Sequence, residues 1–583
     1  MDKEIFKDLN IQQLAAVQKI NGPSIILAGA GSGKTRVLVS KVLNLINNHN
    51  ILSSAIVMIT FTNKAAGEMK KRINQPLGFV GTFHAFCCQI LRRFGPKIGI
   101  DNNFVIYDEG DQKSLIKNIL KKSEQIKFSP AYFINRISTA KSILVNPDDY
   151  LSIFSDYNAA DVAFVYKEYQ KELTKNMAVD FDDLIMKVIE LLKNNNQVLR
   201  YYQDKFKYIL IDEFQDTNHA QYILTKYLAK KSNNITVVGD FSQSIYSWRG
   251  ADIQNLEKFK TDFSQVTTYF LEENYRSSQN ILDFAYSVIS KNQSHPILQL
   301  YTKKNKGRDI VIQNTGNEEG ESLFIAEEIQ RLNLDYSYQQ MAVLYRTNAQ
   351  SRLIEEMFIK SGIPYLLIGG TRFYERREIK DVLSYLRLLI NPLDTVALER
   401  IKKLGKRRYD KYKAFYQNIE DQKNEYKTEE LMDKIFNATG YLENYNVSDE
   451  EDYGRLENIK ELKSVAVSFP DLTQFLEQVA LVESEYFEKE KQKDRLQGVR
   501  LMTLHQAKGL EFEVVFISGL EEGILPHVRS IDDQFQLEEE RRLFYVGITR
   551  AKERLYLTWA QRRFIFGNRI ESIKSRFLDE AEN

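Results

Sequence analysis

The sequence has few features of a secreted or membrane protein. Its only two cysteines, Cys87 and Cys88, are chain neighbours and are poorly placed to bridge. No apolar run approaches the roughly 18 residues that a membrane span needs. The opening residues, MDKEIFKDLN, lack the apolar core of a signal peptide. Together these absences predict a protein of the reduced cytoplasm that does not enter a membrane.

The sequence also lacks an excess of charge of either sign. It has 80 Lys and Arg against 79 Asp and Glu, a formal net charge of +1. A nucleic-acid partner would therefore have to be bound by a local basic surface. The 6 histidines show no metal-ligand spacing, and there is no low-complexity tract, fixed repeat or long flexible linker. The length of 583 residues predicts about four structural units.

Short β-branched segments recur along the chain, each followed by a helix-like stretch. They are apolar on both faces, as expected for the covered strands of parallel sheets. They fall into two sets, which predict an α/β protein with two parallel-sheet domains. The first set is 24–30, 56–62, 208–214 and 235–241; the second is 309–315, 341–347, 364–370, 514–520 and 554–560.

Two blocks rich in Lys, Glu, Leu and Tyr contain no such segments and predict mainly helical insertions. We expect the first α/β domain to comprise 1–108 and 206–285, interrupted by the insertion 109–205. The second domain is expected at 286–389 and 498–583, interrupted by the insertion 390–497.

A glycine-rich turn, AGAGSGKT, follows the first apolar segment and is typical of a phosphate-binding loop. The usual pattern begins with glycine where this chain has Ala28, so the match is imperfect. Backbone N–H groups of the loop and the start of the next helix can bind phosphate oxygens, Lys34 can neutralise the β- and γ-phosphates, and the Thr35 hydroxyl can bind Mg²⁺. The alternative is a glycine turn that only caps a helix. The expected nucleotide contacts are Ala28, Gly29, Ala30, Gly31, Ser32, Gly33, Lys34 and Thr35.

Two carboxylates follow the apolar segment of YILIDEFQDTN (208–218). Hydrolysis of a nucleotide needs one carboxylate for the metal and another to orient and deprotonate water. We expect Asp212 to hold Mg²⁺ through the ion's own waters and Glu213 to act as the base. An Asp-Glu pair after a strand can also be a helix N-cap. Together with the phosphate loop, the pair predicts an NTPase.

The segment VVGDFSQSIYSWRGAD (237–252) places an amide and two aromatic rings after another predicted strand. Gln243 can contact the γ-phosphate without adding charge. Tyr246 and Trp248 lie beside Arg249, an arrangement that suits base stacking in single-stranded nucleic acid. For both rings, and for Tyr246 in particular, the alternative is a place in the hydrophobic core.

Nine blocks of sequence follow one another in a characteristic order. They are LNIQQLAAV (9–17), AGAGSGKT, TFTNKAAGEMKKRI (60–73), GTFHAF (81–86), DEFQD, VVGDFSQSIYSWRGAD, LEENYRSSQNIL (271–282), VRLMTLHQAKGLEFEVVFISGLEEGILP (499–526) and EEERRLFYVGITRAKERLYL (538–557). In this order they resemble the UvrD/PcrA/Rep DNA helicases of superfamily 1. The resemblance extends from residue 9 to residue 557 and is far more specific than a phosphate loop alone.

The resemblance implies roles for further residues around the nucleotide. Gln13 matches the glutamine that binds adenine, Tyr275 the ring that stacks on the base, and Arg36 a further nucleotide contact. Glu511 is similar to the residue that meets the ribose from the second domain. Arg276 and Arg550 match arginines that reach the γ-phosphate from the opposite domain. Taken singly, Gln13 could be a helix-surface residue and Arg276 part of a surface ion pair.

The resemblance also implies contacts with single-stranded DNA. Phe61, Asn63 and Lys64 lie at a strand end, where α/β sheets present ligands, and Phe61 resembles a ring on which a base stacks. Thr82 and His84 resemble contacts to the DNA backbone, although His84 could instead form a structural hydrogen bond. His505 corresponds to a polar link between the nucleotide and DNA sites.

The fold and activity that the resemblance implies are two RecA-like domains with ATP and Mg²⁺ in the cleft between them and single-stranded DNA across their tops. The family implies movement in the 3′-to-5′ direction and unwinding at single-strand/duplex junctions, in repair or replication, by a monomer or weak dimer. A translocase that displaces proteins with little unwinding is the main alternative. A small-molecule kinase would not account for the second domain's arginines, and a non-hydrolysing scaffold would not need Lys34 and Glu213. The chain ends soon after the last motif, which argues against a helicase–nuclease subunit.

The sequence departs from the family after residue 401. Relatives usually carry a Pro-x-Arg-Gly-Ile-Gly core there, which helps their second insertion meet duplex DNA. Here the chain reads KKLGKRRYDK (402–411), and the block to about 497 is shorter than usual. We expect this basic run to attract duplex phosphates diffusely and with strong salt dependence. The alternative is a solvated helix face.

Overall fold

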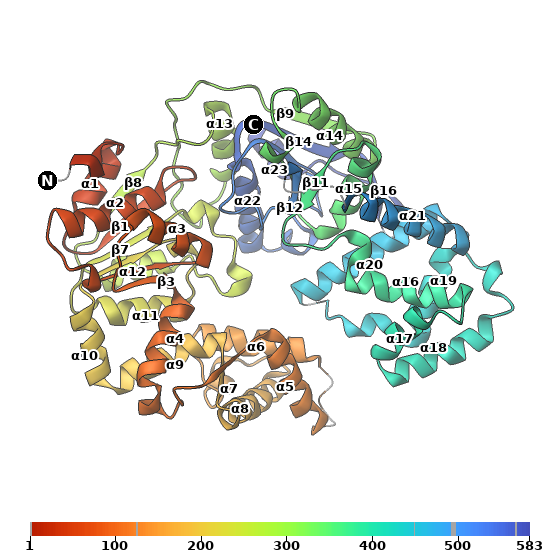
Figure 1. Ribbon diagram of the computed structural model, residues 1–583, viewed down its shortest axis with the longest axis horizontal. Helices are drawn as coiled ribbons and strands as arrows, with labels where there is room; N and C mark the ends of the chain where they lie inside the picture. Colours follow the sequence, from red (N-terminus) through yellow and green to blue (C-terminus); the bar gives the residue numbers. More distant parts are fainter. Residues whose placement is uncertain are drawn as a thin grey trace. The chain divides into compact units, whose positions relative to one another are not determined.

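The computed structural model of the chain describes residues 3–123, 126, 128–447, 449–490, 497–565 and 568–582. The chain forms two compact units, drawn in Figure 1 with colours that follow the sequence. The first unit comprises Met1–Arg276 and Asn292–Lys303, and the second comprises Ser277–Lys291 and Lys304–Asn583. The expected boundary at residue 285 differs from this division, because α13 (Gln279–Ile289) packs against α22 (Gln534–Ile548) and α23 (Arg576–Glu582) of the second unit.

The first unit is built on a six-stranded sheet in the order β3-β2-β6-β7-β1-β8, in which all neighbours are parallel. Alternate residues of its strands enter two separate hydrophobic clusters, so both faces are covered. Ile25 and Leu27 pack with α4, α9, α11 and α12, whereas Ile26 and Ala28 pack with α1, α2 and α3. The strands are β1 (Ser24–Ala28), β2 (Ile56–Thr60), β3 (Phe79–Thr82), β6 (Tyr208–Ile211), β7 (Ile235–Gly239) and β8 (Thr267–Leu271). The helices are α1 (Ile11–Gln18), α2 (Lys34–Asn47), α3 (Asn63–Ile73), α4 (Phe83–Phe94), α9 (Phe181–Asn194), α11 (His219–Ala229) and α12 (Asn255–Asp262).

The second unit contains another six-stranded parallel sheet, in the order β11-β12-β10-β13-β14-β9. One face packs on α14 (Glu318–Leu332) and α15 (Ser351–Lys360) through alternate residues such as Val343 and Phe516. Two covered parallel sheets confirm the predicted fold class. The strands are β9 (Val311–Thr315), β10 (Met341–Tyr345), β11 (Tyr365–Leu367), β12 (Val499–Thr503), β13 (Phe512–Ile517) and β14 (Ala551–Ala560).

Each unit also carries a mainly helical part with its own hydrophobic cluster. In the first unit, helices α5 to α8 gather around a core that includes Ile116, Phe133 and Tyr166 (Figure 1). In the second, helices α16 to α21 share a core that includes Leu386, Ile435 and Phe475. The elements are β4 (Val105–Tyr107), α5 (Glu109–Lys121), α6 (Pro130–Ser142), α7 (Tyr150–Ile153), α8 (Ala159–Lys175), β5 (Ala178–Asp180) and α10 (Asn196–Lys205), then α16 (Arg377–Ile390), α17 (Thr395–Lys403), α18 (Lys406–Ile419), α19 (Thr428–Thr439), α20 (Glu450–Ser468) and α21 (Leu472–Glu490). A short antiparallel pair, β15 (Arg562–Ile565) and β16 (Asn568–Glu571), follows β14. Among the described residues, no helix is both long and apolar enough to cross a membrane.

Candidate functional site

The predicted phosphate loop connects the end of β1 to the start of α2. Gly31 and Gly33 have φ values of 66° and 85°, a left-handed conformation that glycine adopts without steric cost. Gly33 is the N-cap of α2 and has no side chain with which to cap the helix, so the first N–H groups of α2 suit an anion. Lys34 Nζ donates to the carbonyl oxygen of Ala28 at 3.3 Å. Loop, helix start and lysine therefore meet as a phosphate site requires.

The two predicted carboxylates follow β6 directly. The Asp212 side chain is buried, and its Oδ1 has no hydrogen-bond partner among the described residues. Burial and, to a smaller extent, the neighbouring charge of Glu213 raise the pKa of Asp212 to about 7, against the opposing effect of the positive charge of Lys34. Glu213 has φ 50° and ψ 44°, a left-handed backbone that costs a non-glycine residue about 1–3 kcal/mol. Residues with a strained backbone conformation of this kind are commonly found at functional sites.

The residues present fit a magnesium ion chemically. Magnesium prefers oxygen ligands and retains several of its waters. Asp212 offers a buried carboxylate oxygen that lacks a protein partner among the described residues, and Thr35, in the first turn of α2, offers a hydroxyl. A bound cation would favour the ionised form of Asp212, which burial alone disfavours.

Gln215, for which the sequence analysis proposed no role, links two parts of the site. Its Nε2 donates to Glu213 Oε2 at 2.6 Å, and its Oε1 accepts from the backbone N–H of Asp240 at 3.0 Å. Asp240 in turn accepts from Gln243 Nε2 at 2.6 Å. The side chain of Gln215 is fully buried, and a Cβ on Gly239 would lie 2.5 Å from its Oε1. Gln215 therefore holds the predicted base and the Gln243 loop together.

The residues expected at the base of the nucleotide gather beside the phosphate loop. Gln13 is fully buried, so the alternative, a place on the helix surface, is wrong. Its Nε2 donates to the carbonyl oxygen of Ser32 at 2.9 Å, and its Oε1 accepts from the N–H of Asn10 at 3.1 Å. Asn10 Nδ2 also donates to the Tyr275 hydroxyl at 3.0 Å, and the Arg36 guanidinium lies 5.4 Å from the Tyr275 ring centre.

Arg276 is the last residue of the first segment of unit 1, in agreement with the predicted first-domain bounds 206–285. The resemblance had instead implied an arginine that reaches the γ-phosphate from the opposite domain. The Tyr275 N–H donates to the carbonyl oxygen of Gly31 at 3.0 Å, and a Cβ on Gly31 would lie 2.8 Å from the Cβ of Arg276. These contacts hold the backbone of Tyr275 and Arg276 against the phosphate loop. Arg276 therefore belongs to the same unit as that loop.

Arg550, Glu511 and His505 all lie in the second unit. Arg550 is buried; its Nε donates to the carbonyl oxygen of Val546 at 2.8 Å and its Nη1 to that of Leu510 at 3.2 Å. The exposed carboxylate of Glu511 pairs with Lys552 at 3.3 Å. His505 is partly buried just after β12.

Three predicted DNA-contacting rings form one cluster in the first unit. The rings of Phe61 and Tyr246 are stacked with centres 5.7 Å apart and an angle of 9° between their planes. Trp248 is 52% exposed and edge-on to Tyr246, with the Arg249 guanidinium 4.5 Å from its ring centre. Tyr246 is half-buried, so it is neither fully in the core nor fully exposed. The cluster joins the ends of β2 and β7 and offers aromatic faces to a base.

The remaining predicted DNA contacts begin two helices of the same unit. Asn63 and Lys64 are exposed in the first turn of α3. Thr82 caps α4 by accepting from the N–H of Ala85 at 3.3 Å. Burial lowers the pKa of His84 below 6.5, which favours a neutral imidazole at pH 7. Phe181, which is not among the predicted DNA contacts, is an exposed ring edge-on to His84, with ring centres 5.8 Å apart.

The basic run 402–411 spans the end of α17 and the start of α18. Lys406 and Arg407 are exposed in the first turn of α18, whereas Arg408 is half-buried and donates to the carbonyl oxygens of Leu404 and Gly440 at 3.4 Å. Cations in a first turn oppose the helix dipole. The exposed basic surface is therefore formed by Lys406, Arg407 and their neighbours Lys402, Lys403 and Lys411.

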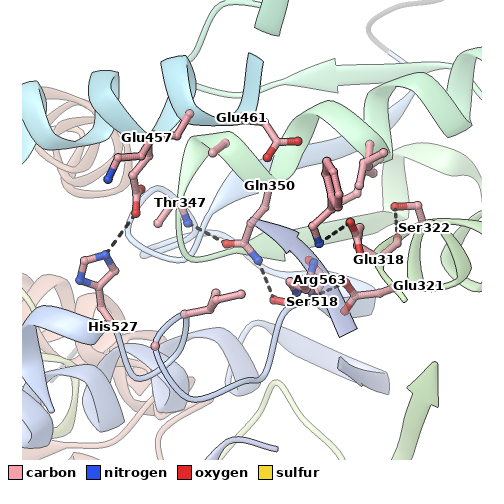
Figure 2. Close-up of a pocket in the computed structure, with 17 residues that line it drawn as sticks. Glu318, Glu321, Ser322, Thr347, Gln350, Glu457, Glu461, Ser518, His527 and Arg563 are labelled. Carbon is pink, nitrogen blue, oxygen red and sulfur yellow. Dashed lines mark hydrogen bonds and ion pairs between the residues drawn. The ribbon is translucent and has the colours of Figure 1, made fainter. Parts of the chain in front are cut away.

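A pocket of about 130 Å³ in the second unit contains none of the predicted residues. Figure 2 shows how side chains from α14, α15 and α20 line it. Gln350 Oε1 accepts from the N–H of Thr347 at 2.9 Å, and His527 Nε2 lies 3.5 Å from Glu457 Oε1. The contact between His527 and Glu457 links α20 to the second sheet domain, whereas the bond between Gln350 and Thr347 is local.

Comparison with known proteins identifies relatives along nearly the whole chain. Residues 9–264 match the UvrD/REP helicase N-terminal domain, and residues 269–408 and 401–562 match the UvrD-like helicase C-terminal domain. The ATP-dependent DNA helicases PcrA of Staphylococcus epidermidis and Staphylococcus aureus are each 42% identical to it, over 99% of this chain and 86% of theirs. The alignments span 633 and 632 positions, more than the 583 residues of this chain, so these relatives carry residues that it lacks.

Proposed function

The chain belongs to the UvrD/REP family of helicases, and we propose that it is an ATP-dependent DNA helicase that moves along single-stranded DNA. One observation carries the proposal. A continuous set of hydrogen bonds runs from Glu213 through Gln215 and Asp240 to Gln243. The segment that carries Gln243 continues directly to Tyr246 and Trp248, which present rings suited to bases. One segment thus carries both a residue proposed for hydrolysis and residues proposed for strand binding.

In the proposed reaction, a water oxygen bonds to the γ-phosphorus of ATP and the bond to the β,γ-bridging oxygen breaks. Glu213 orients that water and accepts its proton. Lys34 and the loop N–H groups stabilise charge on the departing ADP, and Arg276 stabilises charge on the γ-phosphoryl oxygens. Thr35 and Asp212 would hold Mg²⁺, which supplies electrostatic stabilisation of the phosphates when bound.

Residues of the second unit are proposed to complete the nucleotide site. Arg550 would contribute a second arginine to the γ-phosphate, and Glu511 a contact to the ribose. In the first unit, Gln13, Arg36 and Tyr275 would bind the base. The hydrogen bonds from Arg550 to the carbonyl oxygens of Val546 and Leu510 orient its guanidinium, which has five N–H donors in all.

The DNA partner is proposed to be a single strand, or a single-strand/duplex junction, along which the protein moves in the 3′-to-5′ direction. Phe61, Tyr246 and Trp248 would stack on bases, while Asn63, Lys64, Thr82, His84 and His505 would contact the strand. The cellular setting would be repair or replication in the cytoplasm, with a monomer or weak dimer as the working form.

A translocase that displaces proteins with little duplex unwinding is the second candidate. The observation that favours it is that the C-terminal domain match is divided into two stretches, which overlap at residues 401–408, where the basic run begins. An exposed basic surface attracts phosphates by charge and does not fix their positions. Its affinity for duplex DNA should therefore decrease as the salt concentration rises.

The test uses a duplex with a 3′ single-strand tail, its 5′-tailed and blunt counterparts, and a tailed single strand carrying a bound protein block. The proposal expects ATP-dependent displacement from the 3′-tailed duplex and little from the other two duplexes. Removal of the block without unwinding of any duplex would favour the second candidate. If ATP produces neither effect, both candidates fail.

A further inference from the structure

The segment Asn292–Lys303 belongs to the first unit, although the residues on either side of it belong to the second. It contains no helix and takes part in one isolated strand bridge, Glu273 with Tyr301, among the described contacts. None of the predicted site residues lies in it. Its contacts within unit 1 nevertheless reach three separate parts of the proposed ATP site.

The first contact is to the segment that carries Gln243. His295 Nε2 and the Ser242 hydroxyl form a hydrogen bond of 3.1 Å, and both side chains are buried. Ser242 directly precedes Gln243, and its own N–H donates to Asp240 Oδ1 at 3.1 Å. His295 therefore fixes the backbone from which Gln243 extends.

The second contact is to the phosphate loop itself. Leu300 is buried, and a Cβ on Gly29 would lie only 2.3 Å from its Cδ2. The next residue, Tyr301, accepts from the N–H of Asn274 at 2.7 Å through its backbone. Asn274 Nδ2 in turn donates to the carbonyl oxygen of Ala30 at 2.6 Å. Leu300 thus packs on one side of the loop while Tyr301 supports the residue that holds the loop's carbonyl.

The third contact is to the end of the site expected to bind the base. Lys303 Nζ pairs with Glu273 Oε1 at 2.9 Å, and the Glu273 side chain is buried. Glu273 Oε2 accepts from Asn10 Nδ2 at 3.2 Å. Asn10 is the residue that orients Gln13 and Tyr275.

We propose that 292–303 is a positioning strap for the ATP site, in which His295 sets the placement of Gln243 and Leu300 sets that of the phosphate loop. The inference builds on the proposed ATP hydrolysis and adds positioning residues to it. Because the two residues hold different parts of the site, their loss should affect different steps. His295 acts where the γ-phosphate reacts, whereas Leu300 acts where ADP and ATP are both held.

The experiment compares full-length variants at saturating oligothymidylate. His295→Ala should lower kcat for ATP hydrolysis about ten-fold or more while KM changes by less than about two-fold, since misplacing a catalytic group affects the transition state more than binding. Leu300→Ala should weaken binding of a fluorescent ADP analogue about ten-fold. Conservative changes, His295→Gln and Leu300→Met, should restore most of each loss. Gln299→Ala, an exposed change in the same segment, is the matched control.

A double-mutant cycle separates positioning from general destabilisation. Ser242→Ala removes the same hydrogen bond from the other side, so the Ser242→Ala/His295→Ala double variant should turn over no more slowly than the slower single variant. Thermal unfolding of each variant checks that it is folded. Additive losses in the cycle, or a His295→Ala kcat equal to that of Gln299→Ala, would overturn the inference for His295.

The ADP-binding arm does not require hydrolysis, so the strap can fail independently of the proposed function. An unchanged ADP affinity in Leu300→Ala would overturn its role even if the wild-type protein is a helicase. Conversely, a wild-type protein without DNA-dependent hydrolysis that still shows the ADP effect would support the strap and contradict the proposed function.

Discussion

The buried carboxyl of Asp212 should make the metal-free protein less stable above neutral pH. Burial raises its pKa from 3.8 to about 7, so the folded state binds this proton more tightly than the unfolded state does. Ionised Asp212 therefore opposes folding. The destabilisation begins as the pH rises through the pKa of Asp212 in the unfolded state, and it is complete above about pH 7. A pKa shift of one unit corresponds to about 1.4 kcal/mol, so ionised Asp212 destabilises the folded state by at most about 4 kcal/mol.

Replacing Asp212 with Asn removes the buried charge and leaves a side chain of similar shape. We expect the free energy of unfolding of Asp212→Asn to exceed that of the parent by about 1–3 kcal/mol at pH 8. At pH 5 this difference should be about 2 kcal/mol smaller. The same variant should lose Mg²⁺-dependent turnover. A gain in stability with a loss of activity is expected where a destabilising buried charge is needed for function.

The chain has two tryptophans, Trp248 in the first unit and Trp559 in the second. In a Trp559→Phe background, the fluorescence of Trp248 reports urea unfolding of the first unit alone, measured with a chelator and without nucleotide. Asp8→Asn, at an exposed position of the same unit, is the control. A stability difference between Asp212→Asn and its parent that stays constant from pH 5 to pH 8 would show that ionisation of Asp212 does not destabilise the first unit.

Further predictions concern the reaction and the duplex. Glu213→Gln should bind ATP and DNA but lose turnover, because it removes the base and leaves the metal ligands; single-turnover hydrolysis measures this, and normal turnover would exclude Glu213 as the base. Arg550→Ala should lower kcat on the order of 10³; a loss below about three-fold would mean that Arg550 is not at the γ-phosphate. Changing Lys406, Arg407 and Lys411 together to Ala should lower the ratio of unwinding to single-strand ATPase, most strongly at low salt. A ratio unchanged across a salt series would mean that the run is only a solvated face.

Much of the fold could be predicted because the strands of covered parallel sheets are apolar on both faces. The segments containing β1, β2, β6 and β7 were found in this way. β8 was missed because Thr267 to Phe270 are only partly buried or exposed at the sheet edge, so the apolar signal is weak. β12 was missed as a strand because Arg500 interrupts its apolar residues.

The site could be predicted in its residues more than in its connections. The phosphate loop and the Asp-Glu pair are continuous in sequence, so local pattern identified them. Gln215 could not be given a role, because its function depends on Asp240, 25 residues away, being brought beside Glu213. The strap at 292–303 has no helical or strand periodicity, so its importance follows only from tertiary contacts. Likewise, no local pattern places the division between units at Arg276.

If the segment that carries Gln243, Tyr246 and Trp248 couples ATP hydrolysis by the first unit to a DNA strand, the strand should accelerate hydrolysis. The rate of phosphate release from ATP, with and without a single-stranded oligonucleotide, tests this coupling in wild type and in Trp248→Ala. We expect strong stimulation of the wild-type rate by the oligonucleotide and a weaker response in Trp248→Ala, with equal basal rates. Equal wild-type rates with and without the oligonucleotide would show that hydrolysis is not coupled to the strand.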